Sequence, residues 1–295
     1  YCSYSCVYCQ VGRTVHLEVK RRVFYLWSSI VEEVLQAVDK TGAENIDYVT
    51  FVPDGEPTLD LMLGREIRGV KEALDVRVAV LTNGSLLHLE DVREDLMDAD
   101  LVSVKVDAVS EPVYRRVNRP HPSLSLEKVL DGMREFSESF DGELLTETML
   151  VSGLNDEAEE LKAVAEYIAS LKPSKAYIAV PIRPPTEGWV KPPDERVVTM
   201  AYKIFEKLLP GRVELLIGYE GESFKGLSGD PIDDILSITA VHPLRLDYAY
   251  RLLGRLYADP EGVVRKLVRD EKVALVEYGG HRFIVRRVGR RVGVS

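Results

Sequence analysis

The chain has 295 residues, 45% of them hydrophobic and 29% charged, and it carries a formal net charge of −10. This composition excludes a disordered or collagen-like protein. No apolar run is long enough to cross a bilayer, so we expect no membrane partner. The length is enough for one large α/β domain and a smaller second domain.

Six short runs rich in β-branched and apolar residues predict β-strands. They lie at 46–52, 76–81, 101–107, 144–151, 176–180 and 213–218. Stretches with helical spacing of apolar residues separate them, and this alternation is typical of a parallel sheet, either open or curled into a barrel. In both architectures the functional groups gather at the carboxyl ends of the strands.

Polar residues predict where three of these helices begin. Ser29 and Glu32 have the spacing of a capping box in front of an apolar stripe. Asn155 and Asp156 are expected to begin another helix, and Asp194 a third.

The pattern changes near residue 230, and we expect a core domain at 1–225 and a C-terminal domain at 226–295. Three short helical segments precede VALVEYGGHRFIVRR, which predicts a β-hairpin with Gly279 and Gly280 in its turn. Three helices and a hairpin outline a winged-helix-like domain. From Pro231 onward 12 Lys and Arg outnumber 8 Asp and Glu, which fits either a polyanionic partner or a solvated basic end.

All three cysteines lie in the opening stretch YCSYSCVYC, at Cys2, Cys6 and Cys9. This is not the pattern of a disulfide-stabilised secreted protein, so we expect reduced thiols in the cytoplasm. Thiols so close in sequence can converge on one metal centre. Two centres fit: a structural zinc with His16 as fourth ligand, or an iron–sulfur cluster in which one iron lacks a protein ligand.

The spacing C-x3-C-x2-C resembles the signature of the radical SAM superfamily, in which an aromatic residue, here Tyr8, commonly precedes the third cysteine. The resemblance implies that Cys2, Cys6 and Cys9 hold a 4Fe-4S cluster whose fourth iron binds S-adenosyl-L-methionine (SAM). It also implies a partial (β/α)6 barrel and an enzyme that cleaves SAM reductively to a 5′-deoxyadenosyl radical. The electron would come from a reductant such as ferredoxin or flavodoxin.

Two further motifs support the resemblance. DGEP resembles the GGEP-like stretch that ends the family's second strand, where Gly55 would allow close backbone approach and Glu56 would pair with the SAM ammonium group. Asp54 departs from that pattern. LTNG resembles the end of the third strand, with Asn83 expected at the SAM carboxylate or a nearby backbone group; a simple Asn-Gly turn is the alternative.

Polar residues alternate with valines in LVSVKVDA, which places Ser103, Lys105 and Asp107 on one face of a strand. On the resemblance, Ser103 and Asp107 are candidates for contact with the SAM ribose. Lys105 is a candidate for the SAM carboxylate or the substrate. The alternative is an antiparallel strand with one solvated face.

Two more residues are candidates for contact with ligands. Glu147, in TETMLV, is expected to point inward toward SAM or substrate, and Arg183, in VPIRPP, is expected to hold an anionic substrate group. CVYCQVGRT, DGEPTLD and IRPP resemble a largely archaeal subgroup related to wybutosine-type tRNA modification, and TETMLVSGLND resembles molybdenum-cofactor A-type enzymes. The family's first strand does not fit before Cys2, which implies a chain truncated at its amino end.

The sequence therefore predicts a radical SAM enzyme, with tRNA or another nucleotide as a candidate substrate. The alternative from another functional class is a zinc-containing nucleic-acid-binding regulator. The basic C-terminal segment favours that alternative, and the acidic body of the chain disfavours it.

Overall fold

The computed structural model describes residues 1–218 and 230–287. The chain forms two compact units, each described here by itself. The larger unit comprises Tyr1–Cys9, Arg13–Pro181 and Trp189–Ile217, and the smaller comprises Gln10–Gly12, Ile182–Gly188 and the chain from Gly218 onward. The boundary expected between 225 and 226 lies outside the described residues.

A parallel sheet forms the centre of the larger unit. Within the described residues it has six strands in the order β1-β2-β3-β4-β5-β6. The strands are β1 (Tyr48–Phe51), β2 (Arg77–Thr82), β3 (Leu101–Lys105), β4 (Glu143–Met149), β5 (Lys175–Ala179) and β6 (Val213–Leu216). All six predicted strands are confirmed, each with ends within two residues of the predicted ones. The α/β class and the partial-barrel arrangement are confirmed as well.

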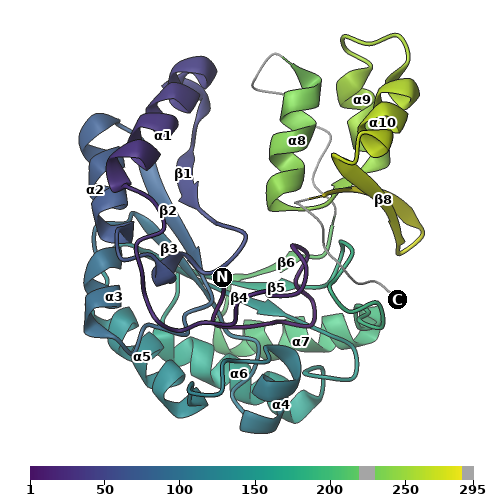
Figure 1. Ribbon diagram of the computed structural model, residues 1–295. Helices are drawn as coiled ribbons and strands as arrows, with labels where there is room; N and C mark the ends of the chain where they lie inside the picture. Colours follow the sequence, from purple (N-terminus) through teal and green to yellow (C-terminus); the bar gives the residue numbers. More distant parts are fainter. Residues whose placement is uncertain (219–229, 288–295) are drawn as a thin grey trace. The chain divides into compact units, whose positions relative to one another are not determined.

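Helices lie along the outer side of this curved sheet (Figure 1). Consecutive helices pack on one another in the pairs α1–α2, α2–α3, α5–α6 and α6–α7. The helices are α1 (Trp27–Thr41), α2 (Leu63–Ala73), α3 (Glu90–Leu96), α4 (Glu111–Val117), α5 (Leu126–Ser139), α6 (Ala158–Leu171) and α7 (Glu195–Leu208), with short 3-10 turns η1 (Ala43–Asn45) and η2 (Pro57–Leu59).

The two faces of the sheet differ in character, because side chains alternate between them along each strand. The face toward the helices is apolar and at most 2% exposed at Val78, Val80, Val102, Val104, Ala176 and Ile178. The opposite face is mixed: Leu81 and Leu145 flank Ser103. Strand register also aligns Lys105, Glu147, Tyr177 and Glu214 in one row, and these side chains stay half-buried or exposed. The open face therefore offers polar groups to a ligand.

Helix starts were predicted with mixed success. Asp194 caps α7 as expected, since its Oδ1 accepts from the Val197 backbone N–H at 3.0 Å. The capping box at Ser29 is wrong: α1 begins two residues earlier, and the Ser29 hydroxyl donates to the Leu26 carbonyl at 2.7 Å inside the first turn. The helix start at Asn155 is also wrong, because α6 begins at Ala158 and Asn155 is buried.

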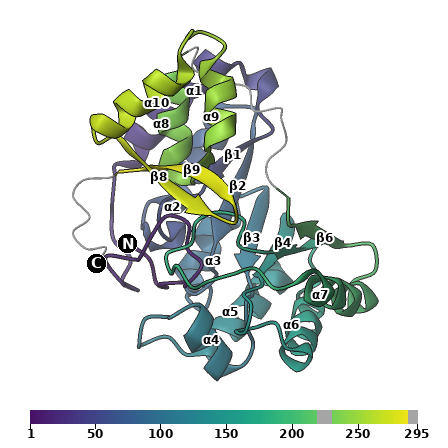
Figure 2. The ribbon, with the colours of Figure 1, turned by 90° about the vertical axis from the view of Figure 1, so that its right-hand side faces the viewer.

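The smaller unit contains the predicted helices and hairpin. They are α8 (Pro231–Val241), β7 (Leu244–Arg245), α9 (Leu246–Leu253), α10 (Pro260–Arg269), β8 (Val273–Tyr278) and β9 (His281–Arg286). Figure 2 shows the hairpin with the three helices beside it, and β9 pairs with both β7 and β8. Gly279 and Gly280 adopt φ of 57° and 77° in the turn, a conformation that glycine adopts without strain. A winged-helix-like domain stays a prediction.

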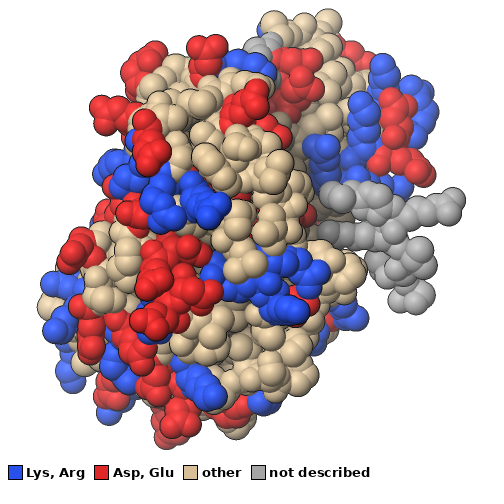
Figure 3. All heavy atoms as spheres, turned by 60° about the vertical axis from the view of Figure 1, so that its left-hand side comes forward, with Lys and Arg blue, Asp and Glu red and all other residues tan. Residues whose placement is uncertain are grey.

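Acidic and basic side chains are intermingled over the face of the molecule in Figure 3, without a large field of one sign. In residues 1–218 and 230–287, no helix has the length and apolar character needed to span a membrane.

Candidate active site

The cysteine loop is tied to the segment that follows α4. The backbone N–H groups of Ser5 and Val7 donate to the carbonyls of Asn118 and Val117, both at 3.0 Å. In the other direction, the His121 N–H donates to the Ser3 carbonyl at 2.9 Å. This strand-like pairing fixes the path of the loop over the carboxyl ends of β2 and β3.

The three thiols of the loop are half-buried, and none of them forms a disulfide bond. The Asn83 side-chain amide lies 3.6 Å from Sγ of Cys2, and that of Asn118 lies 3.6 Å from Sγ of Cys6. Burial, followed by the charge of Glu56, raises the pKa of the Cys2 thiol to about 12. Burial likewise raises the pKa of Cys6, with contributions from Asp107 and from the other two cysteines. The thiolates are therefore favoured only beside a strong positive charge.

The donor set suits an iron–sulfur cluster better than zinc. A structural zinc draws four ligands onto one ion at about 2.0–2.3 Å, whereas each thiolate of a 4Fe-4S cluster binds a different iron. Across the part of the chain that the structure describes, no group of three or more His, Cys, Asp or Glu residues converges on a single ion. The His16 ring, the expected fourth zinc ligand, stacks on Tyr1 with 4.4 Å between ring centroids.

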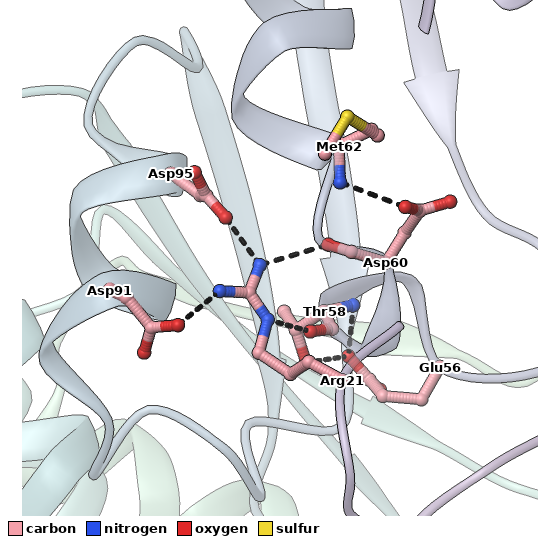
Figure 4. A network of polar contacts seen from close by, with 7 residues as sticks. All are labelled: Arg21, Glu56, Thr58, Asp60, Met62, Asp91 and Asp95. Carbon is pink, nitrogen blue, oxygen red and sulfur yellow. Dashed lines mark hydrogen bonds and ion pairs between the residues drawn. The ribbon is translucent and has the colours of Figure 1, made fainter. Parts of the chain in front are cut away.

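Glu56 is buried beside the loop, and protein groups donate to its carboxylate; Figure 4 shows the donors from Thr58. Oε1 accepts from the N–H and the hydroxyl of Thr58, at 3.1 and 2.7 Å, and from the Thr82 hydroxyl at 2.5 Å. Oε2 accepts from the Asn83 backbone N–H at 2.8 Å. A carboxylate has about four lone-pair sites. Oε1 therefore has three donors and Oε2 has one, so Oε2 holds the Asn83 backbone and keeps a lone pair open. The expected pairing of Glu56 with the SAM ammonium group stays a prediction.

Gly55 lies against the start of the chain. A Cβ built on it would stand 2.1 Å from the Tyr1 carbonyl oxygen, which accepts a hydrogen bond from the Glu56 N–H at 3.1 Å. Close approach of two backbones thus requires glycine here, as expected, although the approaching group is this chain's own cysteine segment. Asp54, the departure from the family pattern, is exposed.

Asp107 lies two residues beyond β3 and connects several parts of the site. Oδ2 accepts from the Tyr8 phenol and from the Asn118 amide, the latter at 2.6 Å, and Oδ1 accepts from the Met149 N–H at 2.8 Å. Burial raises the pKa of Asp107, although Lys105 and these donors oppose it. The carboxylate therefore orients Tyr8 and Asn118, and the ribose contact expected of Asp107 stays a prediction.

Lys105 and Glu147 form an ion pair of 2.5 Å on the open face of the sheet. Burial lowers the pKa of Lys105, but the neighbouring Glu147 and Asp107 carboxylates outweigh it and raise the pKa overall. The ammonium nitrogen lies 5.5 Å from the centre of the Tyr8 ring. Ser103 lies on the same face and is buried. The structure therefore brings Ser103, Lys105 and Glu147 to one face, next to the cysteine loop.

The comparison with protein families now decides the identity. The model of the Radical SAM superfamily matches residues 1–167. This chain belongs to the radical SAM superfamily. It is therefore an enzyme, and the fold, the cysteine spacing and the class predicted from the sequence agree. The zinc-containing regulator is not favoured.

Relatives and solved structures extend this radical SAM assignment. The chain is 41% identical over 292 residues to a UPF0026 protein of Methanocaldococcus jannaschii, covering 99% of this chain and 90% of that protein. It is 21% identical over 232 residues to a Thermotoga maritima protein named as a probable dual-specificity RNA methyltransferase, covering 76% and 65%. The crystal structure of Streptococcus suis SuiB bound to S-adenosylmethionine is similar in fold alone, with a TM-score of 0.53, 13% identity and coverage of 75% and 48%. The finer wybutosine-related and molybdenum-cofactor-related resemblances stay predictions.

Arg183 lies in the smaller unit of this radical SAM protein. Its Nη1 donates to Oε1 of Gln10 at 3.1 Å, and both residues belong to that unit. Its expected contact with an anionic substrate stays a prediction.

Sequence reasoning missed two asparagines that hold the radical SAM site together. Asn118 contacts both Cys6 and Asp107. Asn155 donates to the carbonyls of Asp107 and Met149, both at 2.9 Å, and accepts from the Val151 N–H at 2.8 Å. In the sequence, Asn155 stands out only by its place just after a predicted strand. A polar residue there can belong either to the end of the strand or to the start of the next helix.

Proposed function

We propose that Cys2, Cys6 and Cys9 hold a 4Fe-4S cluster and that SAM binds at the iron that no protein ligand reaches. The observation that carries this proposal is the set of three thiols on one loop at the carboxyl ends of the strands, with side-chain amides beside two of them. Reduced by one electron, the cluster would supply the reductive cleavage of SAM to methionine and a 5′-deoxyadenosyl radical.

The chain's own residues then bind, orient and shield. Asn83, oriented by Glu56, is the candidate for the carboxylate of SAM, beside the close backbone approach at Gly55. Ser103 and Lys105 offer a hydroxyl and an ammonium group on the open face, suited to the ribose and to a carboxylate. Tyr8, turned toward Asp107, covers the loop between two of the cysteines and helps to exclude water from it.

The test is anaerobic reconstitution of the full chain with iron and sulfide. We expect about four irons per chain, the content of one such cluster. Electron paramagnetic resonance (EPR) of the reduced protein should change on addition of SAM, and dithionite should then yield 5′-deoxyadenosine. Serine variants at Cys2, Cys6 and Cys9 should each lose iron, while a Ser5→Ala variant in the same loop should keep it. Iron-loaded protein that never cleaves SAM would contradict the enzymatic proposal.

For the substrate, we favour tRNA or another nucleotide. Support comes from the excess of basic residues after Pro231 and from the similarity to a protein named as an RNA methyltransferase. Binding to tRNA should weaken steeply with salt, as phosphate contacts release counterions. Affinity for tRNA no greater than for heparin would remove the reason to prefer it.

The expected electron donor is a small redox protein such as ferredoxin or flavodoxin. The cytoplasmic location inferred from the clustered thiols stays a prediction. Replacement of dithionite by reduced flavodoxin in the SAM-cleavage assay tests the donor directly.

A further inference from the structure

Arg21 is a buried arginine that joins three segments of the larger unit (Figure 4). Its side chain is only 7% exposed. Nε donates to the Thr58 carbonyl at 2.9 Å, and Nη2 donates to the Asp60 carbonyl at 2.8 Å. Nη1 and Nη2 also pair with the carboxylates of Asp91, at 2.6 Å, and of Asp95.

The geometry uses the fork shape of the guanidinium group. The carbonyls of Thr58 and Asp60 belong to η2 and its C-terminal cap, and carbonyls at the end of a helical turn lack partners within it. One planar group reaches both of them, while two carboxylates on or beside α3 balance its charge. A lysine could keep the charge but not this set of bonds.

The segment that Arg21 fixes also carries the donors to Glu56. Thr58, whose carbonyl accepts from Arg21, gives both its N–H and its hydroxyl to Oε1 of Glu56. The other oxygen of Glu56 accepts from the Asn83 N–H, and the Asn83 amide in turn lies beside Sγ of Cys2. A continuous set of contacts therefore leads from the guanidinium group to the cysteine loop.

The contacts form a closed ring, because Arg21 lies on the chain that leaves the cysteine loop. The Glu18 N–H donates to the Cys2 carbonyl at 3.0 Å. The Arg22 backbone pairs with η2 on both sides: its N–H donates to the Leu59 carbonyl at 2.9 Å, and its carbonyl accepts from the Leu61 N–H at 3.0 Å. Displacement of η2 would therefore move the Glu56 carboxylate relative to Asn83.

We propose that Arg21 is a positioning residue for SAM: it holds η2 in place, and through the Glu56 carboxylate it sets the position of the Asn83 backbone beside Cys2. The inference rests on the proposed function, because it assigns the oriented Asn83 to the SAM-binding end of the sheet. It predicts that loss of the Arg21 side chain affects both η2 and the turn after β2, although Arg21 contacts only η2.

The test compares Arg21→Met with Arg93→Met. Arg93 is a matched control, since it also donates to a backbone carbonyl, that of Leu87 at 2.7 Å, and pairs with a carboxylate, that of Glu135 at 3.0 Å. Its side chain is 18% exposed; the Leu87 carbonyl lies in the turn after β2 and Glu135 lies on α5, so these bonds do not reach η2. Hydrogen–deuterium exchange on the iron-loaded full chain measures the exchange rates of the backbone N–H groups of Thr58 and Asn83.

We expect Arg21→Met to speed exchange at both backbone amides by about tenfold, and Arg93→Met to leave the Thr58 amide unchanged. The dissociation constant for SAM, from the EPR change of the reduced protein, should rise by about tenfold in Arg21→Met at unchanged iron content. Arg21→Lys, which retains the charge and serves if the methionine variant does not fold, should show the same direction with a smaller effect.

Unchanged exchange at Asn83 in Arg21→Met or Arg21→Lys overturns the inference, because it removes the coupling whatever happens at Thr58. Equal acceleration of exchange at the Thr58 amide by Arg21→Met and Arg93→Met overturns it as well. Failure of the proposed function gives a different result: the unsubstituted protein would show no EPR response to SAM. The exchange rate at Asn83 would still decide the structural role of Arg21.

Discussion

The phenol of Tyr8 donates a hydrogen bond to Oδ2 of Asp107, a residue 99 positions further along the chain. This bond joins the cysteine loop to the end of β3. It also gives the buried carboxylate one of its three donors. The loop and the sheet are therefore stabilised together, and removal of the phenolic hydroxyl should affect both.

We predict that Tyr8→Phe lowers the free energy of unfolding by about 1.5–3 kcal/mol, the usual range for a hydrogen bond to a charged group. Denaturant unfolding of the chain measures it. Tyr167→Phe is the control, since its hydroxyl donates to a neutral acceptor, the Leu130 carbonyl, at 2.6 Å. A cost for Tyr8→Phe no larger than for Tyr167→Phe would contradict a charged acceptor at Asp107.

Asn118 should tune the reduction potential of the proposed cluster, because its amide donates to Sγ of Cys6. Hydrogen bonds to the sulfurs stabilise the more negative, reduced state. Asn118→Ala should shift the potential to a more negative value by on the order of 40 mV, the equivalent of about 1 kcal/mol for one electron. An EPR-monitored redox titration checks it, with the exposed Asn45→Ala as control. An unchanged or more positive potential contradicts the prediction.

Gly55→Ala should prevent the cysteine segment from packing. The new Cβ would lie 2.1 Å from a backbone oxygen, which cannot rotate away as a side chain could. We expect a destabilisation of about 3 kcal/mol and reduced iron incorporation on reconstitution. Gly188→Ala, where an added Cβ meets no atom within 4 Å, should change neither quantity. Full iron content in Gly55→Ala would show that the approach at Tyr1 is not required.

The sheet was predictable from the sequence, whereas much of the site was not, and the reason is physical. Burial imposes apolar, β-branched residues on each strand, so all six strands are visible locally. The cysteine spacing is likewise a local feature. The contact of Asn118 with Cys6, by contrast, spans 112 positions and leaves no pattern in either segment.

The role of Glu56 shows a second limit. The motif singled out Glu56, but its hydrogen-bond partners come from η2, at Thr58, and from the end of β2, at Thr82. The sequence alone does not reveal that these groups occupy the carboxylate. A motif thus locates a site more reliably than it assigns the partner of each side chain.

Two ion pairs on the open face of the sheet should differ in their energetic weight. Lys105–Glu147 and Lys175–Glu214 both measure 2.5 Å, but the side chains of the first pair are 27% and 22% exposed, and those of the second 45% and 49%. Lys105→Met should cost about 1–3 kcal/mol, because it leaves Glu147 partly buried without its counter-ion. Lys175→Met should cost little, as is usual for solvated pairs. Denaturant unfolding of both variants measures the two losses of stability. A larger loss for Lys175→Met than for Lys105→Met would contradict the prediction.

Glu66 should make the protein less stable as pH rises. It is buried at the start of α2, Oε1 has no hydrogen-bond partner, and burial, helped by the charge of Asp60, raises its pKa from 4.5 to about 7. The folded state therefore holds a proton that the unfolded state releases near pH 4.5. The stability that this proton contributes is complete below pH 4.5 and is lost as pH rises through 7, at most about 3 kcal/mol.

Glu66→Gln should match the unsubstituted protein at pH 4.5 and melt at a higher temperature at pH 8. The control Glu72→Gln, at an exposed site on the same helix, should show no such pH dependence. Equal gains for Glu66→Gln at both pH values would indicate that the carboxyl group titrates normally in the folded protein.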